Sequence, residues 1–397
     1  MLKQECTIAR RVFTRLFATG FLFAILLCSI VSYGQSHYVV ANDDSPFPAT
    51  GVSFYTVAAN GSLKFLQRVS TGGFGIGGGY FGANRITVRS NSKGECVYAS
   101  EGSTGDIVGI DITTLTATAG TRGSSTDGGT SNGIGLAMND TYLYASFTDS
   151  STIGTFRVHP NCSLTFVNDT AVSGLAQGTV NGMAVRKHLL VLTYTDGSVE
   201  SFDLTSGPPV SHGDKQYTTA FNTSHGASYA NSVDITSDAQ YAIFGDTATS
   251  VMVEVSKISS GTLTKTRVFQ SAAGINSSNV LLSPDESILY VADTQGGSVS
   301  ALFFNKEIGR VTPGCTSATL RGLSRKWSYL GALAPLNESG HGGGVYVAEF
   351  GSASGIGMVK LALVDGGCTL TEANGSPFPD LNSPGLLSIG TFPPRSF

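Results

Sequence analysis

The chain has 397 residues, of which 50 are Gly, 13 are Pro and 13% are charged, and its formal net charge is −4. So low a net charge with so many apolar residues excludes a disordered chain, and Gly without a three-residue period excludes collagen. The abundance of Gly, Ser, Thr and Val favours many short strands joined by tight turns. We therefore expect an all-β protein.

The N-terminus has the pattern of an export signal. Four basic residues precede an uncharged run over residues 16–33, and small residues follow at the usual cleavage positions. We expect cleavage after Gly34, so that residues 1–34 are a signal peptide and the protein is secreted or periplasmic. The pair Arg10-Arg11 also matches a twin-arginine signal, which would mean export after folding.

Two other interpretations of this segment stay open. An uncleaved membrane anchor would also fit, because about 18 apolar residues can just span a bilayer. Cys28 stands where a lipid could be attached, although Leu27 before it is larger than such sites usually take. After cleavage we expect no contact with a membrane.

Cleavage would leave 20 Lys and Arg against 27 Asp and Glu, a net charge of −7, because the segment carries four basic residues and one acid. Binding to a phosphate backbone needs clustered positive charge, and the chain has no run of Lys and Arg. We therefore expect no nucleic-acid partner.

Seven short apolar runs of similar character recur at intervals of 46 to 58 residues. The runs cover residues 38–42, 96–100, 142–146, 189–193, 241–245, 289–293 and 345–349. Each interval is long enough for four strands with their turns, which is one blade of a β-propeller. The sequence therefore predicts a seven-bladed β-propeller over residues 35–397.

The neighbours of each run complete a blade. A strand and a polar turn precede the run, as in residues 279–283 and Pro284-Asp285. An alternating strand and a weaker outer strand follow it, as in residues 298–304 and 63–69. The continuous apolar run predicts a second strand buried between neighbouring blades, and the alternation predicts a more exposed third strand.

The two ends of the chain predict how the ring closes. The first unit begins at its second strand, at Tyr38, and the C-terminus supplies a lone strand over residues 385–391. Pairing these strands would complete the first blade and leave no open edge at the closure. An open pair of sandwiched sheets is the alternative architecture.

Four cysteines follow the signal: Cys96, Cys162, Cys315 and Cys368. An even number in an oxidising compartment permits two disulfides. Three of the four fall just before the outer strand of their blade, and equivalent rim positions should lie too far apart for a bond. We therefore expect at most one disulfide, with Cys96 as a core residue. No C-x-x-C spacing points to zinc.

The segment from the Ser-Pro-Asp turn at residues 283–285, through the run at residues 289–293, to the strand at residues 298–302 resembles the YVTN repeat. This repeat belongs to the seven-bladed lactonase-like propellers, which include 6-phosphogluconolactonases and carboxymuconate cyclases. Residues 375–379 also resemble a short motif that is common in secreted bacterial members of this family. The resemblance spans essentially the whole mature chain and implies the fold, whereas propellers host many unrelated functions.

The lactonase-like enzymes carry a signature of Pro-Arg-His, a strand, a turn and Tyr-x-x-Asn-Glu. The resemblance places His225 at the histidine and Asp246 at the glutamate, although Ser224 replaces the arginine. Glu349, with His341 nearby, reproduces the end of the signature a second time. Such pairs suit lactone opening, which needs a base to activate water and a donor for the oxyanion.

A Gly-rich segment over residues 72–79 predicts an inter-blade loop near the central channel. No helix follows it, so it is not a dinucleotide loop. With Tyr80, Phe81 and Arg85 after it, the loop could wall a ligand pocket. The acidic turns have too few ligands for calcium. We therefore expect neither a metal nor a cofactor.

The first functional hypothesis is a monomeric binding propeller that holds a small molecule, a glycan or a protein at the channel mouth. It rests on the departures from the catalytic signature and on the lack of a basic cluster for a phosphorylated substrate. The second is a lactonase-type hydrolase that opens a sugar or related lactone. A His–carboxylate pair at the channel mouth beside Arg85, Arg89 or Arg186 would favour the enzyme.

Overall fold

The structure is a computed structural model. It describes residues 37–43, 50–76, 84–91, 94–123, 135–148, 150–218, 230–246, 253–269, 277–293, 296–323, 329–336, 343–350, 355–379 and 388–394. The predicted signal peptide lies outside these residues, and a compact unit runs from His37 to Phe397. No helix within the described ranges is both long and apolar enough to cross a membrane.

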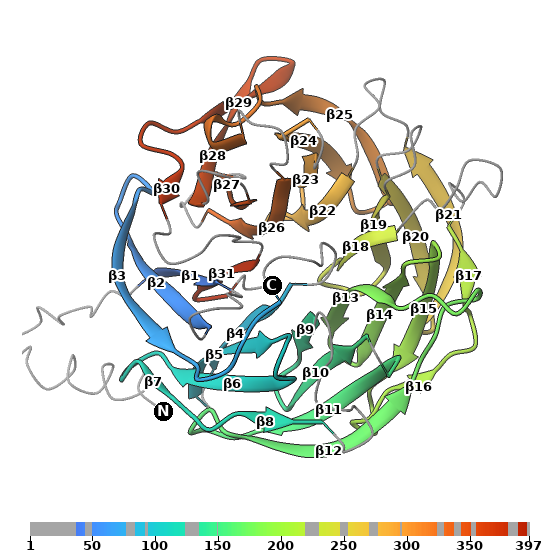
Figure 1. Cartoon of the computed structure of the whole chain (residues 1–397). Helices are drawn as coiled ribbons and strands as arrows, with labels where there is room; N and C mark the ends of the chain where they lie inside the picture. The colour runs from blue at the N-terminus through green and yellow to red at the C-terminus, as the bar shows by residue number, and fades with distance from the viewer. Residues whose placement is uncertain are drawn as a thin grey trace, which may run out of the picture. The chain divides into compact units, whose positions relative to one another are not determined.

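The compact unit is a seven-bladed β-propeller, as the repeat predicts. Seven antiparallel sheets surround one centre, and one edge strand of each sheet faces that centre (Figure 1). From the centre outward, the blades are blade 1, β31(Ser388–Phe392), β1(Tyr38–Asn42), β2(Gly51–Val57) and β3(Leu63–Ser70); blade 2, β4(Ile86–Asn91), β5(Gly94–Glu101), β6(Asp106–Asp111), β7(Thr116–Ala117) and β8(Thr121–Arg122); blade 3, β9(Gly135–Met138), β10(Tyr142–Phe147), β11(Thr152–Val158) and β12(Leu164–Ala171); blade 4, β13(Val180–Arg186), β14(Leu189–Tyr194), β15(Ser198–Asp203), β16(Val210–Ser211) and β17(Gln216–Tyr217); blade 5, β18(Ala230–Ile235), β19(Tyr241–Asp246), β20(Val253–Ser259) and β21(Thr262–Phe269); blade 6, β22(Ser277–Leu282), β23(Ile288–Asp293), β24(Ser298–Asn305) and β25(Arg310–Thr316), followed by the short helix η3(Arg321–Leu323); and blade 7, β26(Tyr329–Pro335), β27(Gly344–Phe350), β28(Gly355–Val364), β29(Gly367–Glu372) and β30(Phe378–Pro379).

The ring closes through the two ends of the chain, and this prediction is confirmed. Strand β31 pairs antiparallel with β1, so that Tyr38 lies opposite Phe392 and Asn42 opposite Ser388. The C-terminal strand thus becomes the innermost strand of blade 1.

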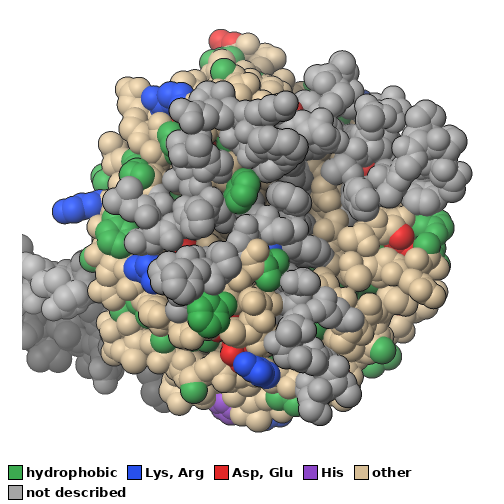
Figure 2. All heavy atoms as spheres, in the orientation of Figure 1, with side chains coloured by type: hydrophobic (Ala, Val, Ile, Leu, Met, Phe, Trp, Pro, Cys, Tyr) green, Lys and Arg blue, Asp and Glu red, His purple; other side chains and the backbone are tan. Residues whose placement is uncertain are grey.

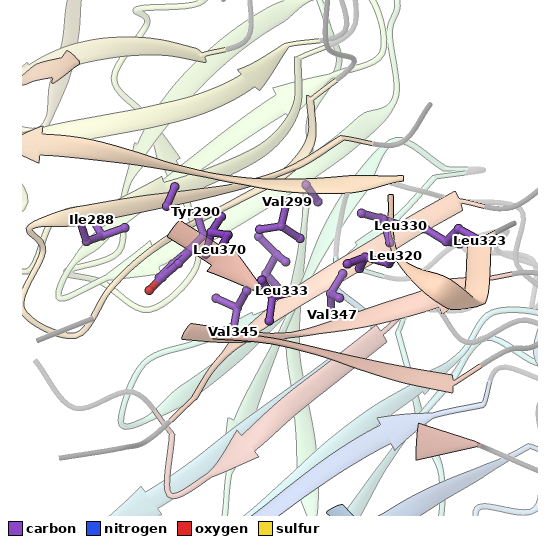
Figure 3. Packing of buried hydrophobic residues seen from close by; sticks show 13 residues of the cluster. Ile288, Tyr290, Val299, Leu320, Leu323, Leu330, Leu333, Val345, Val347 and Leu370 are labelled. Atoms are coloured by element: carbon purple, nitrogen blue, oxygen red, sulfur yellow. The ribbon is translucent and has the colours of Figure 1, made fainter. Parts of the chain in front are cut away.

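The core is divided among the seven interfaces between neighbouring blades, which we call seams. One cluster of buried apolar side chains fills each seam. Figure 3 shows the cluster between blades 6 and 7, where Val299 meets Leu333 and Val347. Successive residues of a strand point to opposite faces, so Val39 packs toward blade 7 and Val40 toward blade 2. Because the second strand of a blade faces a seam on each side, it has to be apolar throughout.

The third strands are more buried than their alternating sequence predicts, and that prediction is wrong. Strand β15 is buried at five of its six positions and β24 at six of eight. Their small polar residues lie inside the seams; Ser201 and Ser300 are almost fully buried. Short hydroxyl side chains fit there because they bond to neighbouring atoms, as Ser201 does to Asp214 at 2.6 Å.

Two disulfides are present, so the expectation of at most one is wrong. Cys96 is bonded to Cys162 across the seam between blades 2 and 3, and Cys315 to Cys368 across the seam between blades 6 and 7. The Cα atoms are 5.6 Å apart in both pairs. Neighbouring blades approach this closely even toward the rim, because their side chains interdigitate in a shared seam.

Candidate functional site

A cavity of about 290 Å³ lies at the centre of the ring. The innermost strands of all seven blades contribute to its wall, mostly with residues from the middle or later part of each strand. Much of the wall is apolar, with half-buried side chains from Val88, Met138, Val185 and Leu281.

Among the described residues, two charged side chains line this cavity: Arg186 at the end of β13 and Asp234 in β18. Their side chains form a loose ion pair, with 3.8 Å between Nη2 of Arg186 and Oδ1 of Asp234. The same Nη2 donates a hydrogen bond to the carbonyl oxygen of Ile235 at 3.3 Å. The side chain of Arg186 keeps 20% of its surface exposed.

Asp234 is held by the backbone rather than by the arginine alone. Its two carboxylate oxygens accept hydrogen bonds from the amides of Ile235 at 2.8 Å and of Leu282, in blade 6, at 2.9 Å. Hydrogen bonds to the ionised form favour that form. Asp234 therefore also joins blades 5 and 6.

Other polar side chains tie the inner strands together around the cavity. Nδ2 of Asn181 donates to Oδ1 of Asn231 at 2.8 Å, and Nδ2 of Asn231 donates to the carbonyl of Ser277 at 3.2 Å. The hydroxyl of Ser232 accepts the amide of Val280 at 3.0 Å. Because the inner strands of different blades do not pair as a sheet, such contacts satisfy their backbone groups and fix the cavity wall.

Asp246 lies at the end of β19 and is fully buried. Its Oδ2 accepts a hydrogen bond at 3.2 Å from the hydroxyl of Thr218, which follows the outer strand of blade 4. Glu101 does the same at another seam, where it accepts the amide of Gly73 and the hydroxyl of Thr50, both at 3.0 Å. Buried carboxylates at the ends of second strands thus serve to join neighbouring blades.

Glu349, near the end of β27, is 1% exposed, and neither of its carboxyl oxygens has a hydrogen-bond partner among the described residues. Its pKa is raised to about 8, mainly by burial and also by the charge of Glu372, while Arg321 acts in the opposite direction. The carboxyl group is packed against Gly322 and Gly357, where any Cβ atom would overlap an oxygen. Glu349 is therefore mostly protonated at neutral pH.

A family model described as "Lactonase, 7-bladed beta-propeller" matches residues 96–373. The chain belongs to this lactonase family. No curated protein matches it.

Several solved structures are also similar to it. A proposed 6-phosphogluconolactonase from Bacteroides uniformis has a TM-score of 0.66 and 13% identity, over 90% of this chain and 99% of that one. A proposed 6-phosphogluconolactonase from Bacteroides fragilis has a TM-score of 0.66 and 11% identity, over 91% and 99%. A protein from Lactobacillus plantarum has a TM-score of 0.54 and 18% identity, over 74% and 80%. At these identities the likeness concerns the fold.

The structure does not test the lactonase-like pairs predicted from the sequence. His225 and His341 lie outside the described residues, so neither histidine is seen beside its carboxylate. Asp246 and Glu349 are both buried and belong to different blades, 5 and 7. Both pairs stay predictions.

The predicted ligand-binding residues also stay untested as a set. Tyr80 and Phe81 lie outside the described residues. Arg85 is fully buried, its pKa is lowered to about 10 by that burial, and it does not line the central cavity. Arg89 is also buried and donates to the carbonyl of His159 at 2.8 Å. Of the three arginines named from the sequence, Arg186 is the one in the cavity wall.

Sequence reasoning missed Asp234 as the partner of Arg186. A signal was present, because Asp234 is a charged residue inside a predicted inner strand, where the neighbouring positions are apolar or small. A charge in such a strand has to face the channel or bond across a seam, and Asp234 does both.

Proposed function

We propose that this lactonase-family propeller is a binding protein that holds a small molecule in its central cavity. The observation that carries the proposal is the cavity itself, whose wall combines a partly exposed arginine with both apolar and polar groups. Ligand pockets have volumes of about 300–1,000 Å³ and are mostly apolar, with few polar groups that fix orientation. The cavity lies at the lower limit of this range, which favours a compact ligand.

The carboxylates of the described residues support binding better than hydrolysis. Asp234 lines the cavity, but each of its carboxylate oxygens already accepts a backbone amide. Asp246 is fully buried and bonded to Thr218. A general base has to reach the water that it activates, at about 2.6–3.2 Å, whereas both of these carboxylates are already bonded to donors of the protein.

A second candidate function is lactone hydrolysis, and two observations favour it. The chain belongs to the lactonase family, and Glu349 has a pKa of about 8, close to the range in which a catalytic acid or base works best. This function would require Glu349 to be reached from the segments outside the described residues. A phosphorylated substrate is less well supported, because Arg186 is the one cation in the described cavity wall.

We also propose that the protein is exported. The two disulfides support this proposal, because disulfides persist in oxidising compartments and are rare in the cytosol. On the face seen in Figure 2, the Lys and Arg side chains of the described residues lie apart from one another. Such a distribution gives no support to binding of a polyanion there.

Calorimetry and ligand-observed NMR with a panel of small molecules test the binding function. We expect ligands whose affinity falls when the cavity is altered by Arg186→Ala, which removes a partly exposed side chain of the wall. The control is Arg157→Ala, because Arg157 is exposed and stacks on Tyr142 of the same blade, at 5.7 Å from its ring centroid. Binding that is equally strong in all three proteins would contradict a central site.

A pH-stat assay with sugar lactones and apolar lactones tests the hydrolase function. Hydrolysis by the wild type that is lost in Glu349→Gln, Asp246→Asn, His225→Ala or His341→Ala would replace the binding proposal by the enzyme. The variant Asp365→Asn serves as the control, since Asp365 lies in an exposed turn. Absence of turnover across the panel leaves the binding function as the better account.

A further inference from the structure

We infer that Glu349 is a proton-controlled latch between blades 6 and 7: protonated, it leaves the short helix η3 closed, and ionised, it binds the amide of Gly322 and opens that helix. Such a latch goes beyond the proposed functions, because it changes the conformation at a seam whether the propeller binds a ligand or opens a lactone. Blades 2 and 7 of the same chain point to it when they are compared.

Glu349 in blade 7 and Glu101 in blade 2 occupy the same position of the repeat. Each ends the pattern Val-Tyr-x-x-Glu. Two residues before the acid, Ala99 packs in the seam between blades 1 and 2, and Val347 packs in the seam between blades 6 and 7. Since alternate residues of a strand share a face, both carboxyl groups point toward the preceding blade.

A glycine of the preceding blade lies against each of these carboxyl groups. Gly73 follows the outermost strand of blade 1, and Gly322 follows the outermost strand of blade 6. A Cβ atom on Gly73 would overlap the carboxyl group of Glu101, and one on Gly322 would overlap that of Glu349. The two seams therefore bring the same pair of residue types together.

The two carboxyl groups differ in their hydrogen bonds. Glu101 accepts the amide of Gly73 at 3.0 Å. It also accepts the hydroxyl groups of Thr50 and Thr104, at 3.0 and 3.1 Å. Glu349 is 1% exposed and accepts no hydrogen bond among the described residues. The charge of Glu101 is thus satisfied inside its seam, whereas a charge on Glu349 would not be.

One donor is missing at Glu349 because the repeat changes in blade 6. Thr50 directly precedes the third strand of blade 1, and Gly297 directly precedes the third strand of blade 6. Their carbonyl groups accept equivalent amides, that of Thr71 at 3.1 Å and that of Leu320 at 2.9 Å. Gly297 therefore occupies the position of Thr50, but it has no hydroxyl group to donate.

The backbone at η3 also differs from its counterpart in blade 1. In η3 the amide of Leu323 donates to the carbonyl of Leu320 at 3.1 Å and closes a tight turn. The equivalent amide of Phe74 donates instead to the hydroxyl of Thr104 at 3.4 Å. The open segment of blade 1 presents its glycine amide to the carboxylate, and the closed turn of blade 6 does not.

Burial keeps Glu349 protonated while η3 is closed, because an ionised carboxyl group that is buried without donors is strongly unfavourable. Its pKa is raised to about 8, mainly by that burial and also by Glu372 from β29, while Arg321 from η3 acts in the opposite direction. Gly357 from β28, which packs against the same carboxyl group, carries no charge.

Ionisation favours the open arrangement. When η3 opens, the amide of Gly322 can turn toward Glu349, as the equivalent glycine amide does in the seam between blades 1 and 2. Arg321 can stay in place, since its amide and its guanidinium both bond to Glu372, at 2.9 and 3.2 Å. One repeat position thus has two arrangements, and the proton on Glu349 selects between them.

Hydrogen–deuterium exchange of the intact protein, resolved to single amides by mass spectrometry, tests the latch. The amide of Leu323 is compared in the wild type and in Glu349→Gln at the same pH, so that the chemical pH dependence of exchange cancels. We expect similar rates near pH 4.5, the ordinary pKa of a glutamate. The wild type should then exchange faster, by up to about tenfold for each pH unit, until the ratio levels off near pH 8.

Glu101→Gln is the matched control, because it changes the acid at the same repeat position where donors are present. It should speed exchange of the Gly73 amide by one constant factor between pH 4.5 and 8, and it should leave Leu323 unchanged. If Glu349→Gln does not fold, Glu349→Met, which is similar in length and carries no charge, takes its place.

A ratio for Leu323 that stays constant from pH 4.5 to 8 would overturn the latch. An increase of the same size at amides throughout β26 and β27 would also overturn it, since exchange would then report unfolding of the whole blade rather than opening of η3. Neither result bears on the proposed functions, which ligand binding and turnover test separately.

Discussion

Tyr38 and Phe392 lie opposite each other on paired strands, and their ring centroids are 6.2 Å apart. Tyr38 begins the first described strand, and Phe392 ends the last one. Their contact joins β1 to β31 within blade 1, and Phe392 also packs into the seam between blades 1 and 2. Closure of the ring therefore depends on residues that are separated by nearly the whole sequence.

Phe392→Ala should destabilise the whole propeller. The ring of Phe392 is 2% exposed, and truncation of a buried Phe costs about 3–5 kcal/mol. Denaturant unfolding followed by circular dichroism measures this loss. Leu175→Ala is the control, because Leu175 is 47% exposed and should change stability little. Equal midpoints for the two variants would show that the closure does not limit stability.

Removal of either disulfide should lower stability by about 2–4 kcal/mol, since a cross-link restricts the unfolded chain. The double variants Cys96→Ala with Cys162→Ala and Cys315→Ala with Cys368→Ala test the two bonds separately. Thermal unfolding with and without a thiol reductant measures the loss. If reductant shifts the wild type but neither double variant differs from the oxidised wild type, the assigned pairings are wrong.

Glu349 should make the stability depend on pH. Its folded pKa of about 8 lies above its ordinary value of 4.5, so the folded protein binds the proton more tightly than the unfolded chain. The contribution of Glu349 to the free energy of unfolding is then fully present below pH 4.5. It is lost as the pH rises toward 8, which lowers the free energy of unfolding by an amount on the order of a few kcal/mol. The variant Glu349→Gln, which imitates the protonated acid, should flatten this slope.

Urea unfolding at several pH values between 4.5 and 9 measures both slopes. Besides the carboxyl group itself, Glu372 and Arg321 are the charged side chains that act on this pKa. Asp365→Asn removes an exposed carboxylate in the turn of the same blade and should keep the wild-type slope. Parallel profiles for the wild type and Glu349→Gln would mean that Glu349 is ionised in the folded protein throughout.

Gly322→Ala should destabilise the seam between blades 6 and 7, because its Cβ would overlap the carboxyl group of Glu349. Overpacking of this kind costs about 1–3 kcal/mol. Gly367→Ala is the matched control, since a Cβ there would meet no atom within 4 Å. Chemical unfolding of both variants gives the comparison, and a Gly322→Ala protein as stable as the control would show that Glu349 can move aside.

The second strands were predictable in detail. The apolar runs at residues 38–42 and 189–193 became β1(Tyr38–Asn42) and β14(Leu189–Tyr194), because a strand that fills a seam on each side has to be apolar at every position. The third strands were not, since Ser201 and Ser300 look exposed in the sequence and are buried by hydrogen-bonded packing. Local patterns report which faces are apolar, but not how closely the next blade approaches.

Sequence alone determined the number of blades, the strands within them and the closure through the C-terminal strand, because each is written into a repeating pattern of neighbouring residues. Only the tertiary structure decided that Cys315 meets Cys368, that Glu349 is enclosed beside Gly322, and that Arg186 and Asp234 share one cavity. Each of these contacts joins residues from different blades. Their distances depend on how seven sheets pack around a common centre, which no single repeat encodes.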